Sequence, residues 1–302
     1  MSESELISDL GPWTERPPCL IELPSGHVLN TESRPLVVGI LNVTPDSFSD
    51  GGRYDSVTRA AEHAREMRAE GADVIDVGGE STRPGAKPVS PEEEQARVLP
   101  VIKELTGEMN VPISIDTRKA EVAAAALGAG AEIINDVSAL RADPEMAPLA
   151  AESGAPVILM HMQGTPKTMQ KNPTYQEVVT EVRDWLEQRV EHAVAAGIGR
   201  GKLIVDPGFG FGKRLGHNLE LLRRLRAFHR LGLPLMAGTS RKSMIGMILD
   251  AGKDERLSGT LATVAVAVMS GCHFVRVHDV GEAVDAVKVC EAVRRGITYG
   301  AD

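Results

Sequence analysis

Short apolar stretches alternate with longer amphipathic stretches along most of this chain. Eight apolar runs, rich in Val and Ile, occupy residues 36–43, 73–78, 112–116, 132–137, 156–162, 203–206, 233–238 and 273–278. These runs are apolar on both faces, which is typical of strands in a buried parallel sheet. They recur about every 34 residues, the length of a strand followed by a crossover helix. The pattern therefore predicts eight strands of one parallel sheet.

The stretches between the apolar runs carry helix signals. Residues 58–70 and 176–196 have apolar side chains at three-to-four spacing, with Glu and Arg between them. Ser90, followed by Pro91, Glu92 and Glu93, is expected to cap the start of a helix. Most of the predicted helices end in glycine, which adopts the left-handed C-terminal conformation without strain. These glycines are Gly71, Gly130, Gly154, Gly197, Gly232 and Gly271.

Eight strands, each followed by a helix, predict a single (β/α)8 barrel of the TIM type over residues 35–302. The alternative is a doubly wound open sheet, which usually has fewer strands. Residues 1–34 are Pro-rich and irregular, with two short apolar segments on either side of a Pro24–Ser25–Gly26 turn. We expect a short N-terminal extension that contains a hairpin, and the sequence suggests no role for it.

Composition and charge narrow the functional classes. The 302 residues are 42% hydrophobic and 25% charged, as in an ordinary globular protein, and the net charge is −9. The acidic balance and the 3% aromatic content argue against a nucleic-acid or membrane-surface partner. The longest apolar run, near residues 261–269, is far shorter than a membrane span. Without a secretory signal, the three cysteines are expected to be reduced thiols in the cytoplasm.

Every predicted strand ends in polar or chargeable side chains. The C-terminal ends of the strands form the active-site rim of a (β/α)8 barrel, so we expect these side chains to meet there. They are Asn42, Asp76, Asp116, Asn135, Asp136, His161, Asp206, Lys242, Arg276, His278 and Asp279. For Asp136 and Asp279 we favour capping of a turn or of the next helix. His161 fits the core as well as the site. Charged groups in a narrow mouth must pair with one another or with a ligand, because unpaired buried ions are costly.

The rim residues divide into two kinds of chemistry. Arg83, Lys242, Arg276 and His278 are cationic or can become so, which suits a phosphate or diphosphate. The segment 240–243 is expected to open a helix, whose free N–H groups would add to an anion site. The side chains of Asp116, Asn135 and Asp206 suit a flat heterocycle that offers amino and ring N–H donors. We therefore predict one half of the rim for an anion and the other for a planar ring.

Several familiar motifs are absent. The glycine-rich segment 208–212 has neither Walker A nor G-x-G-x-x-G spacing, and is expected to be a tight turn that brings Phe209 or Phe211 against a ligand. The histidines and cysteines lack zinc-site spacing. A Mg²⁺ ion held by one protein oxygen and by substrate phosphates is compatible with the rim, with Asn42 and Asp46 or Asp50 as candidates. Asp46 and Asp50 also fit a solvated turn.

Seven segments of the chain resemble the motifs of the dihydropteroate synthase family of pterin-binding barrels. They are residues 42–52 (NVTPDSFSDGG), 76–85 (DVGGESTRPG), 116–117 (DT), 135–136 (ND), 206–213 (DPGFGFGK), 240–242 (SRK) and 276–279 (RVHD). The resemblance implies a (β/α)8 barrel and an enzyme of folate biosynthesis. Such a transferase forms a C–N bond between 4-aminobenzoate and (7,8-dihydropterin-6-yl)methyl diphosphate, releasing diphosphate and 7,8-dihydropteroate.

The resemblance also implies residue roles, a metal and an assembly. Asn42 is expected to bind Mg²⁺ together with the diphosphate, and catalysis is expected to rest on Asp116, Asp206, Lys242, Arg276 and His278. The pterin diphosphate would contact Thr82, Asp116, Asn135, Asp206, Lys242, Arg276 and His278. The 4-aminobenzoate side, where sulfonamides would compete, would consist of Phe48, Asp50, Arg83, Pro84, Phe211 and Ser243. The family implies a cytoplasmic homodimer.

Two other functions stay open at this point. A methyltransferase on the same kind of barrel, passing a methyl group from a folate to a corrinoid, would not need the three cationic candidates Lys242, Arg276 and His278 together. A non-catalytic pterin-binding paralogue would be expected to have lost some rim residues, and none is missing.

Overall fold

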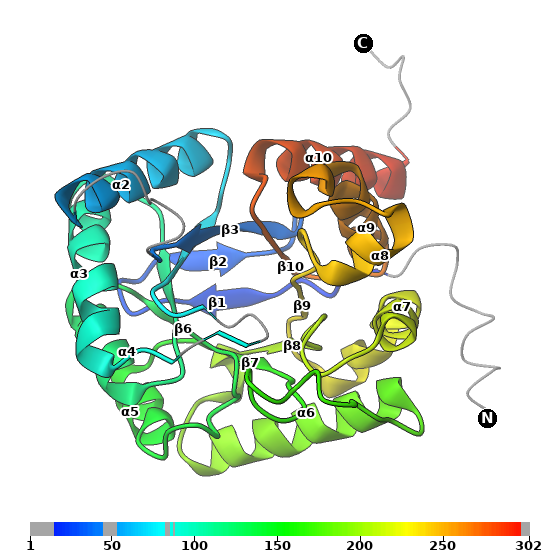
Figure 1. Ribbon diagram of the computed structural model, residues 1–302, viewed down its shortest axis with the longest axis horizontal. Coiled ribbons are helices and arrows are strands. Elements are labelled where there is room, and N and C mark those ends of the chain that lie inside the picture. Colours follow the sequence, from blue (N-terminus) through cyan, green and yellow to red (C-terminus); the bar gives the residue numbers. More distant parts are fainter. Residues whose placement is uncertain (1–14, 45–52, 82–84, 87, 297–302) are drawn as a thin grey trace.

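Eight parallel strands form a ring that is surrounded by helices (Figure 1). The structure is a computed structural model, and it describes residues 15–44, 53–81, 85–86 and 88–296. The strands of the ring are β3 (Leu36–Asn42), β4 (Val74–Gly78), β5 (Ile113–Asp116), β6 (Ile133–Asp136), β7 (Val157–Met160), β8 (Leu203–Asp206), β9 (Met236–Ala237) and β10 (Phe274–Val277). They pair in the order β8-β7-β6-β5-β4-β3-β10-β9. A bridge between Val205 of β8 and Leu235, directly before β9, joins the two ends of this order and closes the ring. The predicted barrel is confirmed.

Helices follow the strands in the expected alternation. They are α2 (Arg53–Ala69), α3 (Pro91–Glu108), α4 (Ala120–Gly128), α5 (Met146–Ser153), α6 (Val178–Ala195), α7 (Leu215–Arg223), α8 (Ser243–Leu249), α9 (Leu257–Met269) and α10 (Val280–Arg295). The short 3-10 helices are η2 (Arg200–Lys202), η3 (Leu225–Leu231) and η4 (Lys253–Glu255). The expectation of one helix per strand is wrong for β9, which both α8 and α9 follow. Ser90 caps α3 as predicted, since its Oγ accepts from the Glu93 N–H at 3.2 Å.

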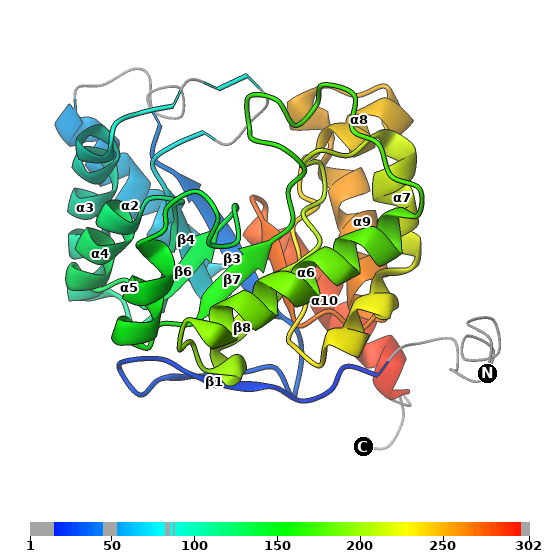
Figure 2. The same cartoon turned by 90° about the horizontal axis from the view of Figure 1, so that it is seen from below.

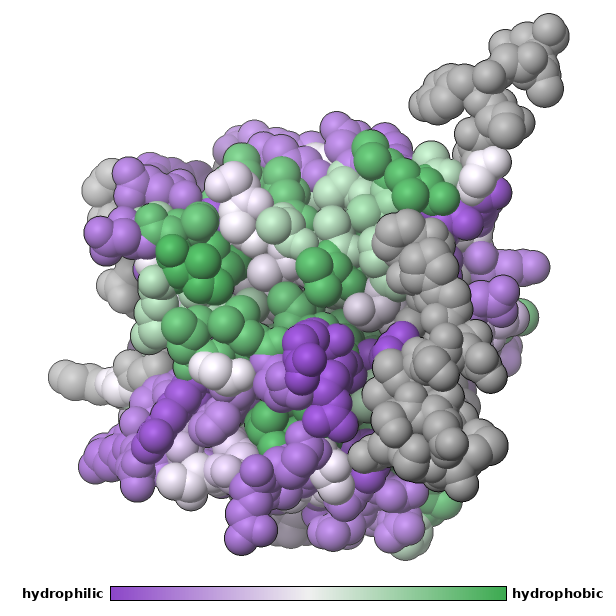
Figure 3. All heavy atoms as spheres, turned by 90° about the vertical axis from the view of Figure 1, so that its right-hand side faces the viewer, coloured by the Kyte–Doolittle hydropathy of each residue, from purple (hydrophilic) through white to green (hydrophobic). Residues whose placement is uncertain are grey.

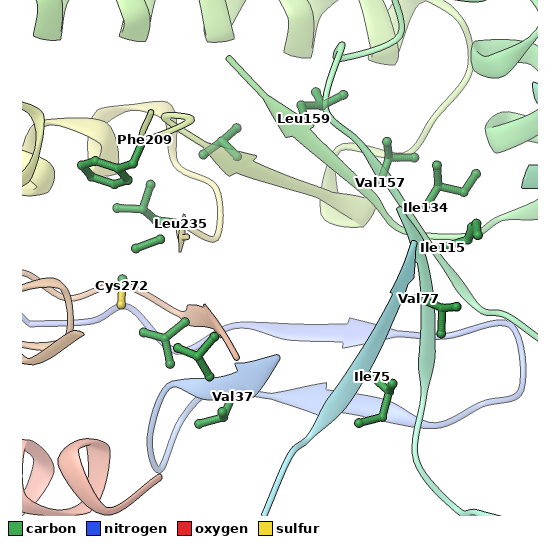
Figure 4. Packing of buried hydrophobic residues seen from close by; sticks show 14 of the residues in the cluster. Val37, Ile75, Val77, Ile115, Ile134, Val157, Leu159, Phe209, Leu235 and Cys272 are labelled. Carbon is green, nitrogen blue, oxygen red and sulfur yellow. The ribbon is translucent and has the colours of Figure 1, made fainter. Parts of the chain in front are cut away.

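Alternate residues of each strand point outward and pack against the helices. Side chains such as Val37, Ile75, Ile134 and Val157 belong to this layer, and Figure 4 shows part of it. Their neighbours along the strands point into the barrel, because successive side chains of a strand lie on opposite faces. Burying one such Val or Ile stabilises the fold by roughly 1.5–3 kcal/mol. This layer makes the helices and the sheet one core.

The inside of the barrel changes from apolar to polar along the strands. Leu36, Val74, Ile133, Ile204 and Phe274 belong to an apolar cluster around the first halves of the strands. Two positions later, on the same inward face, β4, β6, β8 and β10 carry Asp76, Asn135, Asp206 and Arg276. The strands are therefore apolar on both faces only in their first halves, and their second halves supply the polar site.

The N-terminal hairpin closes the apolar end of the barrel. Its strands β1 (Leu20–Glu22) and β2 (Val28–Asn30) pair antiparallel, and Figure 2 shows it across the lower end of the molecule. The side chains of Ile21, Leu23 and Leu29 join the apolar cluster inside the barrel. The sequence suggested no role for this segment, whereas the structure shows it as a plug that keeps water from that cluster.

Two further features concern the described ranges alone. None of the helices there is long and apolar enough to cross a membrane. The three thiols Cys19, Cys272 and Cys290 are free, and burial raises the pKa of Cys272 to about 12.

Candidate active site

Arg276 lies at the centre of the polar end of the barrel, between two carboxylates from other strands. Its Nε donates to Asp76 Oδ2 at 2.6 Å and its Nη2 donates to Asp116 Oδ2 at 2.8 Å. The three side chains come from β10, β4 and β5, and Arg276 is 160 residues from Asp116 in the chain. The expectation that charged groups of the rim pair with one another is confirmed for Asp116 and Arg276.

Asp76 links this ion pair to Asn135. The Nδ2 of Asn135 donates to Asp76 Oδ2 at 2.9 Å, so one carboxylate oxygen accepts from both Asn135 and Arg276. The sequence analysis recognised Asp76 as a strand-end residue but did not include it among the site residues. The signal that could have found it is its inward position, two residues after Val74 in an otherwise apolar strand.

Burial controls the electrostatics of the acidic half. Burial raises the pKa of Asp116 to about 7; Arg276 opposes this rise, while the nearby carboxylates of Asp76 and Glu94 add to it. Burial also raises the pKa of Asp206, against the hydrogen bond from the Gly208 N–H and the charge of Lys242. That hydrogen bond to Asp206 Oδ1 is 2.7 Å long. Both acids are therefore held in a site where a ligand's N–H donors compete with a proton.

Lys242 and Phe211 face each other beside Asp206. The Nζ of Lys242 lies 4.2 Å from the centre of the Phe211 ring, a distance typical of a cation–π contact. Phe209 is only 1% exposed and packs in the core layer of Figure 4. Of the two phenylalanines that the glycine-rich segment was expected to bring to a ligand, Phe211 therefore fits that position and Phe209 does not.

A buried lysine holds the segment 207–213 in shape. The Nζ of Lys213 lies 2.8 Å from His161 Nδ1, and it donates to the backbone oxygens of Gly208 and Phe211 at 2.9 and 3.0 Å. His161 also packs edge-on against Trp185, with the ring centres 4.8 Å apart. The question of core or site for His161 is answered by this contact set, which places the ring in the buried support beneath the rim. Sequence analysis left Lys213 without a role.

The segments after β9 and β10 are joined by two polar contacts. Ser240 Oγ lies 3.0 Å from His278 Nδ1, and Arg241 pairs with the carboxylate of Asp279. The expectation of a cap at Asp279 is wrong, because no side-chain cap bond forms at α10 and the carboxylate is occupied by Arg241. Asp136, by contrast, accepts from Ser138 and Leu140 in a turn, as expected.

The surroundings of His278 favour its neutral form. Burial, followed by the nearby cations Arg276, Arg241 and Lys242, lowers its pKa to about 3. Of the two forms that the sequence allows for His278, these surroundings therefore favour the neutral ring over the cation. A neutral ring still supplies one N–H donor and one acceptor.

Asn42 stands at the end of β3, where its side chain is partly exposed. Its neighbour in register on β4 is Gly78, which has no side chain to cover it. In the described ranges, no group of three or more His, Cys, Asp or Glu side chains could hold a metal ion. A metal here would therefore need oxygens from its ligand as well as from Asn42.

Several residues expected at the site lie outside the described residues. These are Phe48, Asp50, Thr82, Arg83 and Pro84, together with Asp46. Ser243 is described as the exposed first residue of α8, directly after Lys242. The described members Asp116, Asn135, Asp206, Lys242, Phe211, Arg276 and His278 are brought to one mouth, through the contacts given above.

A second charged cluster, which sequence analysis also missed, lies beside this mouth. Lys119 pairs with the carboxylates of Glu80 and Glu94, and Arg118 donates to Glu80 at 3.0 Å. Glu94 is fully buried in α3, while Glu80 lies two residues after the end of β4. The cluster ties the segment after β4 to α3 and to the start of α4.

Comparison with known proteins gives a consistent result. Residues 38–278 match the family model described as "Pterin binding enzyme". A curated relative, the dihydropteroate synthase of Escherichia coli strain K12, is 54% identical over 260 residues, which cover 86% of this chain and 92% of the relative.

Two solved structures extend the comparison to the fold. The Yersinia pestis dihydropteroate synthase in a sulfonamide drug complex has a TM-score of 0.85 at 48% identity, covering 89% of this chain and 98% of that one. The Xanthomonas albilineans dihydropteroate synthase in complex with 7,8-dihydropteroate has a TM-score of 0.83 at 42% identity, covering 91% and 98%. With this fold, this rim and these similarities, the chain belongs to the dihydropteroate synthase family of pterin-binding enzymes.

Proposed function

We propose that this protein joins 4-aminobenzoate to (7,8-dihydropterin-6-yl)methyl diphosphate, forming 7,8-dihydropteroate and releasing diphosphate. The observation that carries the proposal is the convergence of Arg276 and Lys242 with Asp116, Asp206 and Asn135 at one mouth. Acceptors for a flat ring and cations for its departing diphosphate lie side by side there. The similarity to dihydropteroate synthases, one of them solved with 7,8-dihydropteroate, supports the same reaction.

The pterin ring is proposed to bind at the acidic half. Asp116 and Asp206 would accept from amino and ring N–H groups, and the carboxamide of Asn135 would add one further hydrogen bond. Lys242, which faces Phe211, would approach the ring from the segment after β9. The two carboxylates would also stabilise positive charge that develops on the ring when the leaving group departs.

Arg276 and His278 are proposed to hold the diphosphate, with Thr82. During the reaction the bond between the methylene carbon and the diphosphate oxygen breaks. The aromatic amine of 4-aminobenzoate then forms the C–N bond and gives up a proton. The guanidinium of Arg276 supplies fixed positive charge, whereas neutral His278 supplies an N–H donor. No residue needs to form a covalent intermediate, so positioning and electrostatic stabilisation would account for catalysis.

Mg²⁺ is the proposed cofactor, and the described residues are compatible with it. Asn42 brings a carboxamide oxygen to the partly exposed end of β3, beside a glycine. Mg²⁺ commonly takes few protein oxygens and completes its shell with water and substrate phosphates. When bound, the ion would offset the negative charge of the departing diphosphate.

The 4-aminobenzoate side is proposed to lie around Phe211 and Ser243, together with Phe48, Asp50, Arg83 and Pro84. Sulfonamides would compete for the same place, which the sulfonamide complex of the Yersinia pestis relative supports. Raising 4-aminobenzoate should therefore restore activity in the presence of a sulfonamide.

The test is diphosphate release by the purified protein with both substrates and Mg²⁺. We expect release only when both substrates are present, strong loss of release in Lys242→Ala, and loss of release when EDTA removes Mg²⁺. Pterin binding without diphosphate release under any condition would instead support a non-catalytic paralogue. Unchanged release in EDTA would remove the metal from the proposal while leaving the reaction in place.

We also infer a homodimer, built on the outer face of α8, α9 and α10. Figure 3 shows an apolar area on this side of the molecule. Its large exposed side chains are Met247, Ile248, Leu249, Val266, Val289 and Val293. Apolar patches of this kind usually mark protein interfaces, and a second copy would cover the same helices in a symmetric contact. Val289→Glu combined with Met247→Glu should convert a dimer into a monomer in sedimentation experiments, and a wild-type monomer would refute the inference.

The cytoplasm is the proposed location. Free thiols at Cys19, Cys272 and Cys290 are compatible with a reducing compartment. Cell fractionation with an antibody against the protein would test this placement.

A further inference from the structure

The carboxylate of Asp76 is fully buried, and it contacts two groups that the proposed function uses. Its Oδ2 accepts from Asn135 Nδ2 at 2.9 Å and from Arg276 Nε at 2.6 Å. It is the third residue of β4, one layer below the mouth, and no role has been assigned to it above.

The other oxygen of the same carboxylate has no hydrogen-bond partner among the described residues. Asp76 Oδ1 is buried and unpaired there. A buried carboxylate with an unpaired oxygen costs folding free energy, which a neutral side chain of similar size would avoid. Arg276 would still have a partner without Asp76, because its Nη2 donates to Asp116. Stability alone therefore gives a poor account of an aspartate at this position.

The contact with Asn135 has a consequence for recognition. An ionised carboxylate can only accept hydrogen bonds, so the amide nitrogen of Asn135 must face Asp76. The two ends of a carboxamide are almost equal in size, and only such a partner determines which of them faces a ligand. With Nδ2 turned toward Asp76, the orientation of Asn135 Oδ1 is determined as well.

We propose that Asp76 is a positioning residue, which sets the donor and acceptor sense of Asn135 toward the pterin ring and holds Arg276 for the diphosphate. The inference rests on the proposed function, since Asn135 and Arg276 are the groups expected to touch the substrate. Asp76 itself acts through these two side chains. Its loss should therefore weaken binding of the pterin substrate and leave binding of 4-aminobenzoate unaffected.

The neighbouring strand offers a matched control. Ser114 lies opposite Asp76 in the register of β4 and β5, and its Oγ is likewise buried without a partner among the described residues. Ser114→Ala therefore changes a buried polar side chain in the same layer, without touching Asn135 or Arg276 in any contact described here. It should leave pterin affinity within about twofold of the wild type.

The experiment measures the Kd of 6-hydroxymethylpterin by calorimetry for wild type, Asp76→Asn, Asn135→Ala and the double variant. Asp76→Asn should raise the Kd at least tenfold. In the Asn135→Ala background the same change should raise it less than twofold, because the group that Asp76 orients is gone. In steady-state assays, Asp76→Asn should raise KM for the pterin diphosphate and leave KM for 4-aminobenzoate unchanged. If Asp76→Asn does not fold, Asp76→Glu, which keeps the charge but moves the carboxylate, takes its place in the cycle with the same expectation.

Two results would overturn the inference. One is a wild-type Kd in Asp76→Asn, and the other is an equal factor for this change with and without Asn135. A general loss of structure would raise both KM values together, and this too would refute a positioning role. If the wild-type protein itself does not bind 6-hydroxymethylpterin, the proposed function fails and the inference fails with it. If the wild type binds and Asp76→Asn binds equally well, the inference alone fails, so the two failures are distinguishable.

Discussion

The ammonium nitrogen of Lys213 lies 2.8 Å from Nδ1 of His161, with both side chains buried. The backbone oxygens of Gly208 and Phe211, and that of His161 at 3.5 Å, also accept from the same nitrogen. These acceptors provide partners for all the N–H donors of the side chain, although burial lowers the pKa of Lys213 well below its usual value. Burial likewise lowers the pKa of His161, which keeps that ring neutral. The shape of the segment that carries Phe211 therefore depends on one buried side chain.

Replacing Lys213 by methionine should destabilise the protein strongly. The change removes the donor to the Phe211 carbonyl oxygen and the partner of the His161 ring nitrogen, both buried, and we expect a loss of about 3–5 kcal/mol in the free energy of unfolding. Urea denaturation measures it. Lys288→Met is the control, because Lys288 is exposed and its ion pair, within the described part of the chain, is with Asp285 on the surface of α10. Its expected effect is roughly 0–1 kcal/mol. Equal effects of the two changes would show that the buried contacts of Lys213 contribute nothing.

Alanine should be excluded at Gly208 and accepted at Gly216. A Cβ on Gly208 would lie 2.0 Å from the backbone oxygen of His161, and the φ of +69° is itself unfavourable for alanine. Gly216 lies in α7 with nothing within 4 Å of the same added atom. We expect Gly208→Ala to lower soluble yield and pterin affinity, and Gly216→Ala to raise stability by about 0.5–1 kcal/mol. Thermal unfolding and pterin titration measure these effects in both variants. Normal pterin binding by Gly208→Ala would contradict the close packing of Gly208 against the backbone of His161.

Pterin affinity should depend on pH through Asp116. Burial raises the pKa of this carboxyl to about 7 in the free site, and the ring's N–H donors require the ionised form. As the pH falls from 8 toward 5.5, the proton competes with the ligand, so the Kd of 6-hydroxymethylpterin should rise by up to about tenfold per pH unit below 7. Asp116→Asn should bind weakly and with a flatter profile. If the Kd depended on pH equally steeply in the wild type and in Asp116→Asn, another group would be responsible for the titration.

The hairpin should contribute to stability without contributing to the chemistry. Ile21 is fully buried in the apolar end of the barrel, whereas its neighbour Leu20 is 64% exposed. Ile21→Ala should cost about 2–5 kcal/mol and Leu20→Ala under about 0.5 kcal/mol. Both variants should release diphosphate at the wild-type rate per folded molecule, because the hairpin lies at the opposite end from the mouth. A fall in that rate for Ile21→Ala alone would mean that the plug also shapes the site.

Much of this architecture could be predicted from local periodicity. Burial on one or two faces repeats every two residues in a strand and about every 3.6 in a helix, and both periods are visible without knowing any long-range contact. The strand count, the glycines that end helices and the Ser90 cap all follow from such short-range patterns. All six of those glycines have positive φ values. The rim residues follow from the same reasoning, because parallel strands end on the same side of a barrel.

Partnerships across the barrel could not be predicted in this way. Asp76 and Arg276 are 200 residues apart, and nothing local to either indicates that they meet. Phe209 and Phe211 are each flanked by two glycines, yet Phe209 packs in the core and Phe211 faces Lys242. Asp279 stands where a helix cap is common, but Arg241 competes for its carboxylate.

By itself, then, the order of residues determined the number of strands, the kind of barrel and the polar character of its mouth, since each follows from which face of a short segment avoids water. Only the tertiary structure decided which acid pairs with which cation, which pKa values are shifted by burial and what the first hairpin covers. These depend on distances between segments far apart in the chain and on how completely water is excluded between them. Neither quantity can be read from a local pattern.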